Sequence, residues 1–301
     1  MDARILTSKT IAGNQENWAI QHGLGCCRYT QKVEDNLFEN FMDSRTKREF
    51  SDGKGRELEG AKAHMKALCS SSALVVNFFD YWRRNGLLKG IGHVLDVEGQ
   101  ISDMLFEKTH PITGLETRTP PHLDIEFRSA IPFAIESKFT ETYHRKTRRV
   151  DQETHLKAYL VLEDIWISLP KLRYLAELID KQSEEKTDFE YLGVPQLIKH
   201  ILGLHCAYGN QFVLCYLWYE VPSQEASRHK YELAQFEKGI SGEVPFRSLT
   251  YQDLFNKVRE LQEVNLDYLE YISKRYFEPT IYPIHSKPNH TVSTTNKPIP
   301  T

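Results

Sequence analysis

Two short stretches of alternating apolar and polar residues constrain this 301-residue chain more than any other feature. In the run His122 to Arg128 every second residue is apolar, and in the run Phe133 to Phe139 the apolar residues Phe133, Ile135 and Phe139 fall on one side of the same alternation. Because side chains alternate between the two faces of a strand, both runs are predicted to be strands with one apolar and one polar face. The short connection Ser129 to Pro132 predicts that they pair as an antiparallel hairpin.

Helical patterns and two further extended runs surround this hairpin. Apolar residues recur at threes and fours from Glu57 to Trp82, and strand-like runs cover Ile101 to Lys108 and Gln211 to Glu220. The order helix, three strands, helices, strand, helices predicts an α/β fold whose mixed central sheet is flanked by helices. The predicted organisation is an N-terminal extension over 1–56, a core domain over 57–222, C-terminal helices packed on the core over 223–280, and a flexible tail over 281–301.

Composition and charge exclude several broad classes of protein. The 38 Lys and Arg residues against 41 Asp and Glu residues give a net charge of −3, which rules out a bulk polycation. The longest apolar stretch, Phe212 to Tyr219, is far shorter than the roughly 20 residues that a bilayer crossing needs. The first residues lack a basic segment followed by an apolar one, so no secretory signal is expected. These features predict a cytoplasmic protein that does not enter a membrane.

The polar face of the hairpin carries the residues with the clearest chemical use. The pairing places Asp124 beside Glu136 and Lys138. Two neighbouring carboxylates repel each other unless a cation lies between them, and Mg²⁺ prefers such oxygen ligands. A metal held there, with an ammonium beside it, is suited to phosphodiester hydrolysis. The alternative is a polar face that meets solvent, on which Glu136 and Lys138 are ordinary surface charges.

These residues also resemble a known signature. Pro121-His122-Leu123-Asp124 followed by Ala134-Ile135-Glu136-Ser137-Lys138 is similar to the motif of the PD-(D/E)xK nuclease superfamily, and Lys66 to Phe79 resembles the N-terminal helix block of a prokaryotic branch. The motif's proline stands at Pro121 rather than directly before Asp124. The resemblance implies a restriction-endonuclease-like core with the element order αβββαβ. It also implies that Asp124 and Glu136 bind Mg²⁺, or Mn²⁺, and that Lys138 assists the attacking water.

Accessory residues are less clearly marked. The superfamily often adds another acid, for which Glu59 is the first candidate and Glu98 and Glu107 are the others. It also often adds a glutamine on the helix after the third strand. Gln196 occupies a comparable place, although a polar residue in the first turn of a helix explains it equally well.

Two other groups of residues are candidates for binding a metal or DNA. His200, His205 and Cys206 do not have the spacing of a usual zinc site, so ordinary placement is expected for them. The basic segment after the third strand is predicted to contact DNA phosphates, with a solvated loop as the alternative. Its cations are Arg145, Lys146, Arg148 and Arg149.

Two functions therefore compete at this stage. The first is a Mg²⁺-dependent deoxyribonuclease, expected to be an endonuclease, with DNA as its partner. The second is a nuclease-like fold without catalysis that binds nucleic acid or a protein. The oligomeric state stays open, with a homodimer among the alternatives.

Overall fold

A five-stranded mixed sheet forms the centre of the molecule. The computed structural model describes residues 7–25, 28–39, 44–53, 57–60, 63–116, 118–146, 156–181 and 188–278. The strands are β1 (Asp103–Thr109), β2 (His122–Arg128), β3 (Phe133–Lys138), β4 (Val213–Trp218) and β5 (Phe246–Thr250). They lie side by side in that order. The first three strands are antiparallel, whereas β4 and β5 run parallel to β3. The predicted hairpin is confirmed by the pairing of Ile125 with Ile135.

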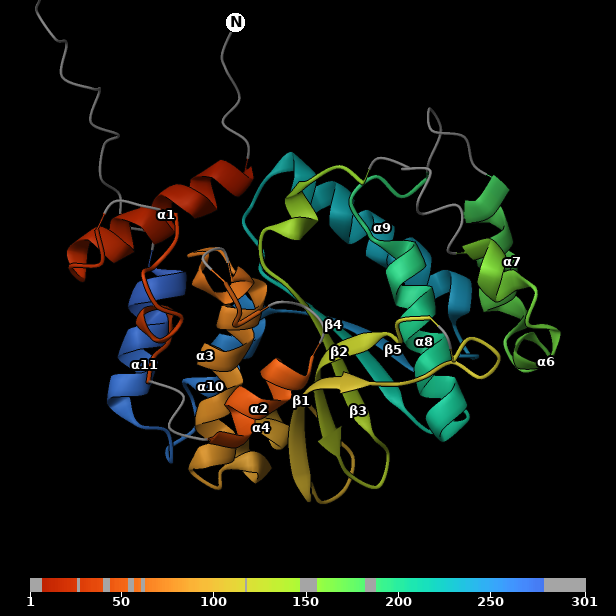
Figure 1. Cartoon of the computed structure of the whole chain (residues 1–301), viewed down its shortest axis with the longest axis horizontal. Coiled ribbons are helices and arrows are strands. Elements are labelled where there is room, and N and C mark those ends of the chain that lie inside the picture. Colours follow the sequence, from red (N-terminus) through yellow and green to blue (C-terminus); the bar gives the residue numbers. More distant parts are fainter. Residues whose placement is uncertain are drawn as a thin grey trace, which may run out of the picture.

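Helices cover both faces of this sheet. They are α1 (Thr7–Gln21), α2 (Ser44–Asp52), α3 (Ser71–Arg84), α4 (Leu88–Val94), α6 (Glu163–Trp166), α7 (Pro170–Lys181), α8 (Val194–Tyr208), α9 (Gln224–Ile240), α10 (Tyr251–Val258) and α11 (Leu266–Ile272). Figure 1 shows the strands between one group of helices that includes α3 and α10 and another that includes α8 and α9. The predicted mixed α/β core with flanking helices is therefore confirmed.

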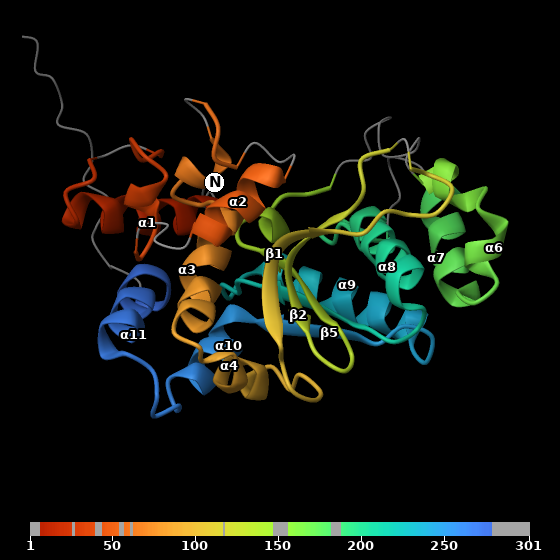
Figure 2. The same cartoon turned by 60° about the horizontal axis from the view of Figure 1, so that its bottom comes forward.

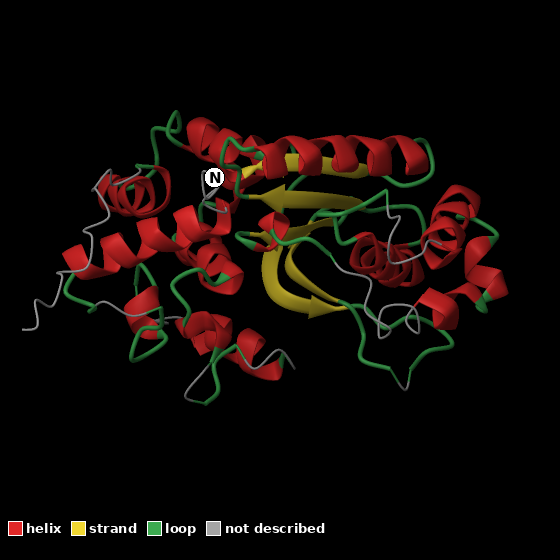
Figure 3. Ribbon diagram, turned by 90° about the horizontal axis from the view of Figure 1, so that it is seen from above, coloured by secondary structure: helices red, strands yellow, loops and turns green. Residues whose placement is uncertain are grey.

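The two faces of the sheet contact different helices. On the apolar face, the Phe127 ring lies 6.3 Å from the ring of Phe79 in α3, and Ser137 Oγ lies 2.7 Å from the Tyr251 hydroxyl of α10. On the polar face, the Trp218 ring lies 4.9 Å from that of His229 in α9. Figure 3 shows helices on both sides of the strands. The polar face of β2 and β3 is therefore covered by helices, and the alternative of a face open to solvent is wrong.

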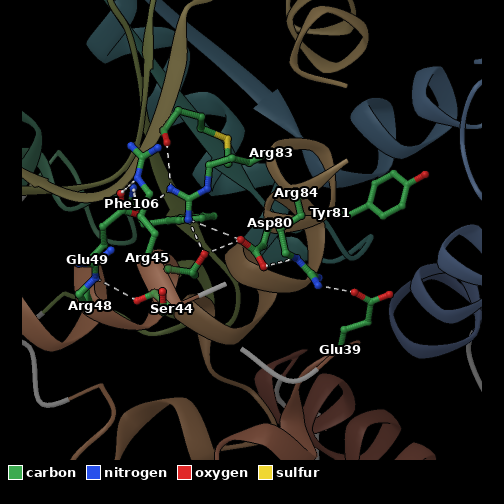
Figure 4. A network of polar contacts seen from close by, with 12 residues as sticks. Glu39, Ser44, Arg45, Arg48, Glu49, Asp80, Tyr81, Arg83, Arg84 and Phe106 are labelled. Carbon is green, nitrogen blue, oxygen red and sulfur yellow. Dashed lines mark hydrogen bonds and ion pairs between the residues drawn. The ribbon is translucent and has the colours of Figure 1, made fainter. Parts of the chain in front are cut away.

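A network of charged side chains attaches α2 to the outer strand β1 (Figure 4). Arg83 of α3 binds Glu49 at 2.7 Å and the Met104 carbonyl at 3.0 Å. The backbone N–H of Phe106 donates to Glu49 at 3.3 Å, so the unpaired side of β1 finds a partner in α2. Arg45 adds a bidentate pair to Asp103 at 2.7 and 2.9 Å. Because α2 covers β1, the outer strand does not present a free edge for association.

A second polar cluster joins the two ends of the described chain. Gln15 of α1 donates to the Arg275 carbonyl at 2.9 Å, and the buried Arg275 guanidinium donates to the Asn36 carbonyl at 2.8 Å. The same guanidinium stacks over the Trp18 ring at 4.2 Å. Figure 2 shows α1 and α11 next to each other. The N-terminal residues therefore pack on the C-terminal helices.

Several predicted boundaries were wrong. The apolar spacing that begins at Glu57 forms only a 3-10 turn over His64–Lys66 before α3. The serine run at 70–72 predicts a helix cap there, and this is confirmed, because the Ser70 side chain accepts from the Ala73 N–H. The apolar spacing from Tyr251 to Lys274 predicts one helix, which is divided into α10 and α11 instead, and β5 was not predicted. The predicted tail over 281–301 lies outside the described residues. Within the described ranges, no helix combines the length and apolar character that a bilayer crossing requires.

Candidate active site

Three charged side chains meet where β2 begins and β3 ends. The antiparallel register of these strands places Asp124 next to Glu136. The backbone N–H of Ser137 donates a 2.6 Å hydrogen bond to Asp124 Oδ2. The Lys138 ammonium forms an ion pair with Glu136 Oε1. The structure thus brings together the two acids and the lysine that the alternating pattern places on one face.

A histidine from α8 completes the surroundings of Glu136. His200 Nε2 lies 3.0 Å from Glu136 Oε2, and both side chains are only 3% exposed. Burial alone would raise the pKa of Glu136, but the charges of Lys138 and His200 outweigh it and lower the pKa to about 2. Glu136 is therefore ionised at neutral pH, with an ammonium at one oxygen and an imidazole at the other.

Sequence reasoning missed the role of His200. The spacing of the sequence raises only a zinc site for His200, together with His205 and Cys206. His205 Nε2 instead lies 2.9 Å from Ser168 Oγ. The available signal was its position one helical turn after Gln196, on the same helix. Gln196 itself is exposed in the first turn of α8, which fits the simpler of its two interpretations.

The pKa of Asp124 is shifted in the opposite direction to that of Glu136. Burial and the Glu136 carboxylate raise the pKa of Asp124 well above its ordinary value, with a smaller contribution from Glu107, and Lys138 only partly opposes the shift. Burial would lower the pKa of Lys138, but Glu136 above all raises it beyond its ordinary range. Lys138 therefore stays an ammonium, while Asp124 lacks a cation of its own.

Of the three candidates for an additional acid, Glu107 lies nearest to the other carboxylates. The ladder pairs on either side of it place Glu107 across from Asp124. Its φ of 50° is in the left-handed region, where a non-glycine residue is strained, and such strain often accompanies a functional constraint. His122 Nδ1 lies 3.7 Å from its Oε2. Glu59 is exposed, and Glu98 is exposed beyond the opposite end of β1.

A further acid, Glu57, was not among the sequence candidates. Burial raises the pKa of Glu57, the Ser72 hydroxyl opposes the shift, and the Glu107 carboxylate adds to it. Glu57 also borders a cavity of about 400 Å³ between the N-terminus of α3 and the turn after β3. The acid cluster thus extends from the sheet to a cavity at the same end of the molecule.

The family comparison agrees with this arrangement. A family model described as "Restriction Endonuclease associating with ARP" matches residues 10–277, which is most of the chain. The chain belongs to this family. Neither the curated proteins nor the solved structures contain a match. The family description names a restriction endonuclease, so membership supports a nuclease.

The donor set of this restriction-endonuclease family member fits a hard divalent cation. Within the described ranges, no group of three or more His, Cys, Asp or Glu side chains is arranged to hold a metal ion. Mg²⁺, however, is usually bound through one or two carboxylates, with water and substrate phosphate as the other ligands. Asp124 and Glu136 supply two such carboxylates, and the raised pKa of Asp124 is a shift that a cation would reverse.

The predicted basic segment is only partly described. Arg145 is exposed and binds Glu190 at 2.5 Å, so its charge is already paired. Lys146 donates to the Glu141 carbonyl at 2.9 Å, and burial and then the charge of Lys138 lower its pKa. Lys146 therefore lies near the site. The other two predicted cations, Arg148 and Arg149, lie outside the described residues.

Proposed function

We propose that this protein is a metal-dependent deoxyribonuclease of the PD-(D/E)xK type that cuts within DNA. Asp124 and Glu136 are assigned to Mg²⁺ or Mn²⁺, Glu107 to the same acid cluster, and Lys138 to the attacking water and the phosphate. The observation that carries the proposal is the meeting of Asp124, Glu136 and Lys138 at the ends of two paired strands, in a chain of a restriction-endonuclease family.

Each side chain has a role that follows from its charge. A bound metal supplies a Lewis acid and lowers the pKa of its water. Because Lys138 is an ammonium, it orients water and offsets the charge that develops on the phosphate, and it does not accept the proton. Glu136 holds Lys138, and His200 holds Glu136 from the other side. In the hydrolysis, the water oxygen bonds to phosphorus and the bond to one bridging oxygen breaks, while the proton of the attacking water passes to solvent and the leaving oxygen takes a proton from solvent.

Incubation with supercoiled plasmid and Mg²⁺ or Mn²⁺ tests the proposal. We expect nicked and then linear plasmid, no product with EDTA, and cutting by Asp124→Asn that is slower by about 10²–10³-fold. The exposed Asp267 lies in the first turn of α11, so Asp267→Asn is a matched control that should cut as the wild type does. Intact plasmid with every metal, or equal cutting by Asp124→Asn, would overturn the catalytic proposal. Cutting of linear but not circular DNA would show an exonuclease instead.

The family description favours a second candidate. It names association with a partner called ARP, so the chain could serve as a non-catalytic module that binds nucleic acid or that partner. This candidate predicts DNA or protein binding that is unchanged by Asp124→Asn. Intact DNA after long incubation, together with such binding, would favour it. Light scattering at several concentrations would decide whether the chain forms a homodimer.

A further inference from the structure

Two cations near the candidate site have no assigned role. Lys199 lies in α8, directly before His200, and Arg118 lies in the connection from β1 to β2. Figures 1 and 2 show this connection, in yellow, passing beside α8. The two segments are in close contact at Gly203, where an added Cβ would lie 2.7 Å from both the His110 carbonyl oxygen and a Pro121 ring carbon.

Lys199 lies on the side of α8 that contacts the β1–β2 connection. Residues four apart lie on one side of an α-helix, so Lys199 shares the side of α8 on which Gly203 meets the loop. Lys199 is half-buried, whereas Arg118 is exposed. Burial and then the charge of Arg118 lower the pKa of Lys199, as expected for two neighbouring cations. No ion pair or side-chain hydrogen bond joins either of them to another residue in the part of the chain that the structure describes.

The pair also lies at the end of the sheet that carries the acids. The connection joins the last residue of β1 to the first residue of β2, so it leaves the sheet where Glu107 and Asp124 are found. On the helix, Lys199 is the neighbour of His200, which contacts Glu136. Within the described residues, Lys199 and Arg118 have no ion pair with a carboxylate, and each lies on a segment that leads to the acids: α8 carries His200, and the connection joins β1 to β2.

We propose that Lys199 and Arg118 bind a backbone phosphate of the DNA strand, on the β1–β2 side of the catalytic carboxylates. The inference rests on DNA as the substrate of the proposed function. Repulsion between two neighbouring cations destabilises the free protein, and an anion bound between them removes this repulsion. A phosphodiester next to the one being cut supplies that anion, and Lys and Arg contacts to phosphate do not depend on base sequence.

This assignment differs from the one based on sequence. The predicted basic segment carries its cations at nearby positions directly after β3. Arg145 is paired with Glu190, whereas Arg118 and Lys199 lie far apart in sequence, on two segments that contact each other at Gly203. Arg259→Gln is a matched control for Arg118→Gln, because both remove one exposed guanidinium and Arg259 follows α10, on the other face of the sheet.

The test is binding of a fluorescently labelled 20-base-pair duplex in EDTA, where no cleavage occurs, at several salt concentrations. Arg118→Gln and Lys199→Gln should each weaken binding several-fold at low salt and reduce the slope of log K against log salt by about 1. The double variant should reduce it by about 2. Arg259→Gln should leave the slope within error of the wild type. Thermal unfolding of the Arg118 and Lys199 variants should match or exceed the wild type, because one of two neighbouring like charges has been removed.

The outcomes separate this inference from the proposed function. A wild-type slope in both single variants, or an equal loss in Arg259→Gln, would overturn the phosphate position even if plasmid is cut. If the slope of log K against log salt is reduced in the two variants but the wild type leaves the plasmid uncut, the phosphate position is supported and the nuclease proposal is contradicted. A wild type that neither binds the duplex nor cuts plasmid would overturn both.

Discussion

The charge network around Arg83 and the candidate active site both bury ionised groups, but they balance them differently. In the network, Asp80 and Glu49 both face the Arg83 guanidinium, at 3.6 and 2.7 Å. In the site, Asp124 faces carboxylates on both neighbouring strands, and Lys138 is engaged by Glu136. In the network each of these carboxylates is thus paired with a guanidinium, and the pairs stabilise the fold. The site keeps a carboxylate that lacks a cation, as expected where a ligand supplies the missing charge.

The largest effect should come from breaking the balanced network. Arg83 and Asp80 are only 6% and 4% exposed, and removal of one partner of a buried ion pair typically costs about 3–5 kcal/mol. We expect Arg83→Met to lower the free energy of unfolding by that amount in urea titrations. The control is Arg48→Met, which removes an exposed arginine of α2 and should change stability by less than about 0.5 kcal/mol. Equal stability of the two variants would show that the network is not structural.

The site variant Asp124→Asn should lose activity and keep its stability, in contrast to Arg83→Met. Asp124→Asn keeps the shape of the side chain and an acceptor for the Ser137 N–H, but removes the charge. We expect the rate of plasmid cutting with Mg²⁺ to fall by about 10²–10³-fold, the size of a lost electrostatic contact in a transition state. Urea unfolding should show no loss of stability. A variant that cuts slowly and is also strongly destabilised would mean that Asp124 is a structural residue like Arg83.

A smaller effect is expected at His200, which contacts Glu136 and would act on the proposed metal only through that carboxylate. Groups that hold a metal ligand typically change metal affinity by about 10–100-fold when they are lost. Calorimetric titration with Mn²⁺ should show this loss for His200→Ala and partial rescue for His200→Gln. His205→Gln alters another histidine of α8, which contacts Ser168, and should bind Mn²⁺ as the wild type does. Unchanged affinity in His200→Ala would remove His200 from the site.

Patterns within single strands were predictable from sequence, and contacts between distant segments were not. The alternation around Asp124 and Glu136 determines which residues share a face, so their proximity followed once the hairpin was recognised. The strand β5 was missed because the sequence Phe246 to Thr250 is short and carries polar residues at its centre. Its exposed residues reflect its place at the outer edge of the sheet.

The contacts that other elements add to the candidate site depend on packing that the local sequence does not show. His200 is one of many residues in a largely apolar helix, and only the packing of α8 on β3 shows that it faces Glu136. Glu107 could not be ranked above Glu59 because the choice depends on the register between β1 and β2. The clustering of cations along the chain favoured Arg145, whereas the fold pairs it with Glu190. The sequence thus predicted that Asp124, Glu136 and Lys138 share one face, but not the contacts that distant segments add.

The smallest effects should appear when two acids of β2 are compared across pH. Burial would raise the pKa of Glu126, but His110 at 2.7 Å and Tyr208 at 3.0 Å lower it, whereas burial and Glu136 raise that of Asp124. A lowered pKa stabilises the protein above the unfolded-state value, and this gain is lost as pH falls. Glu126→Gln should therefore cost about 1–3 kcal/mol near neutral pH and less in acid.

A raised pKa has the opposite sign, because the wild type loses stability as pH rises through the folded-state value of Asp124. Asp124→Asn should therefore be more stable than the wild type near neutral pH, by about 1 kcal/mol, as is common when an active-site charge is removed. The advantage should vanish in acid, where the wild-type Asp124 is protonated. Urea unfolding of both variants from acid to neutral pH should give stability differences of opposite sign that both shrink toward acid. Differences of the same sign would mean that Asp124, like Glu126, is balanced by its neighbours, and the contrast between network and site would fail.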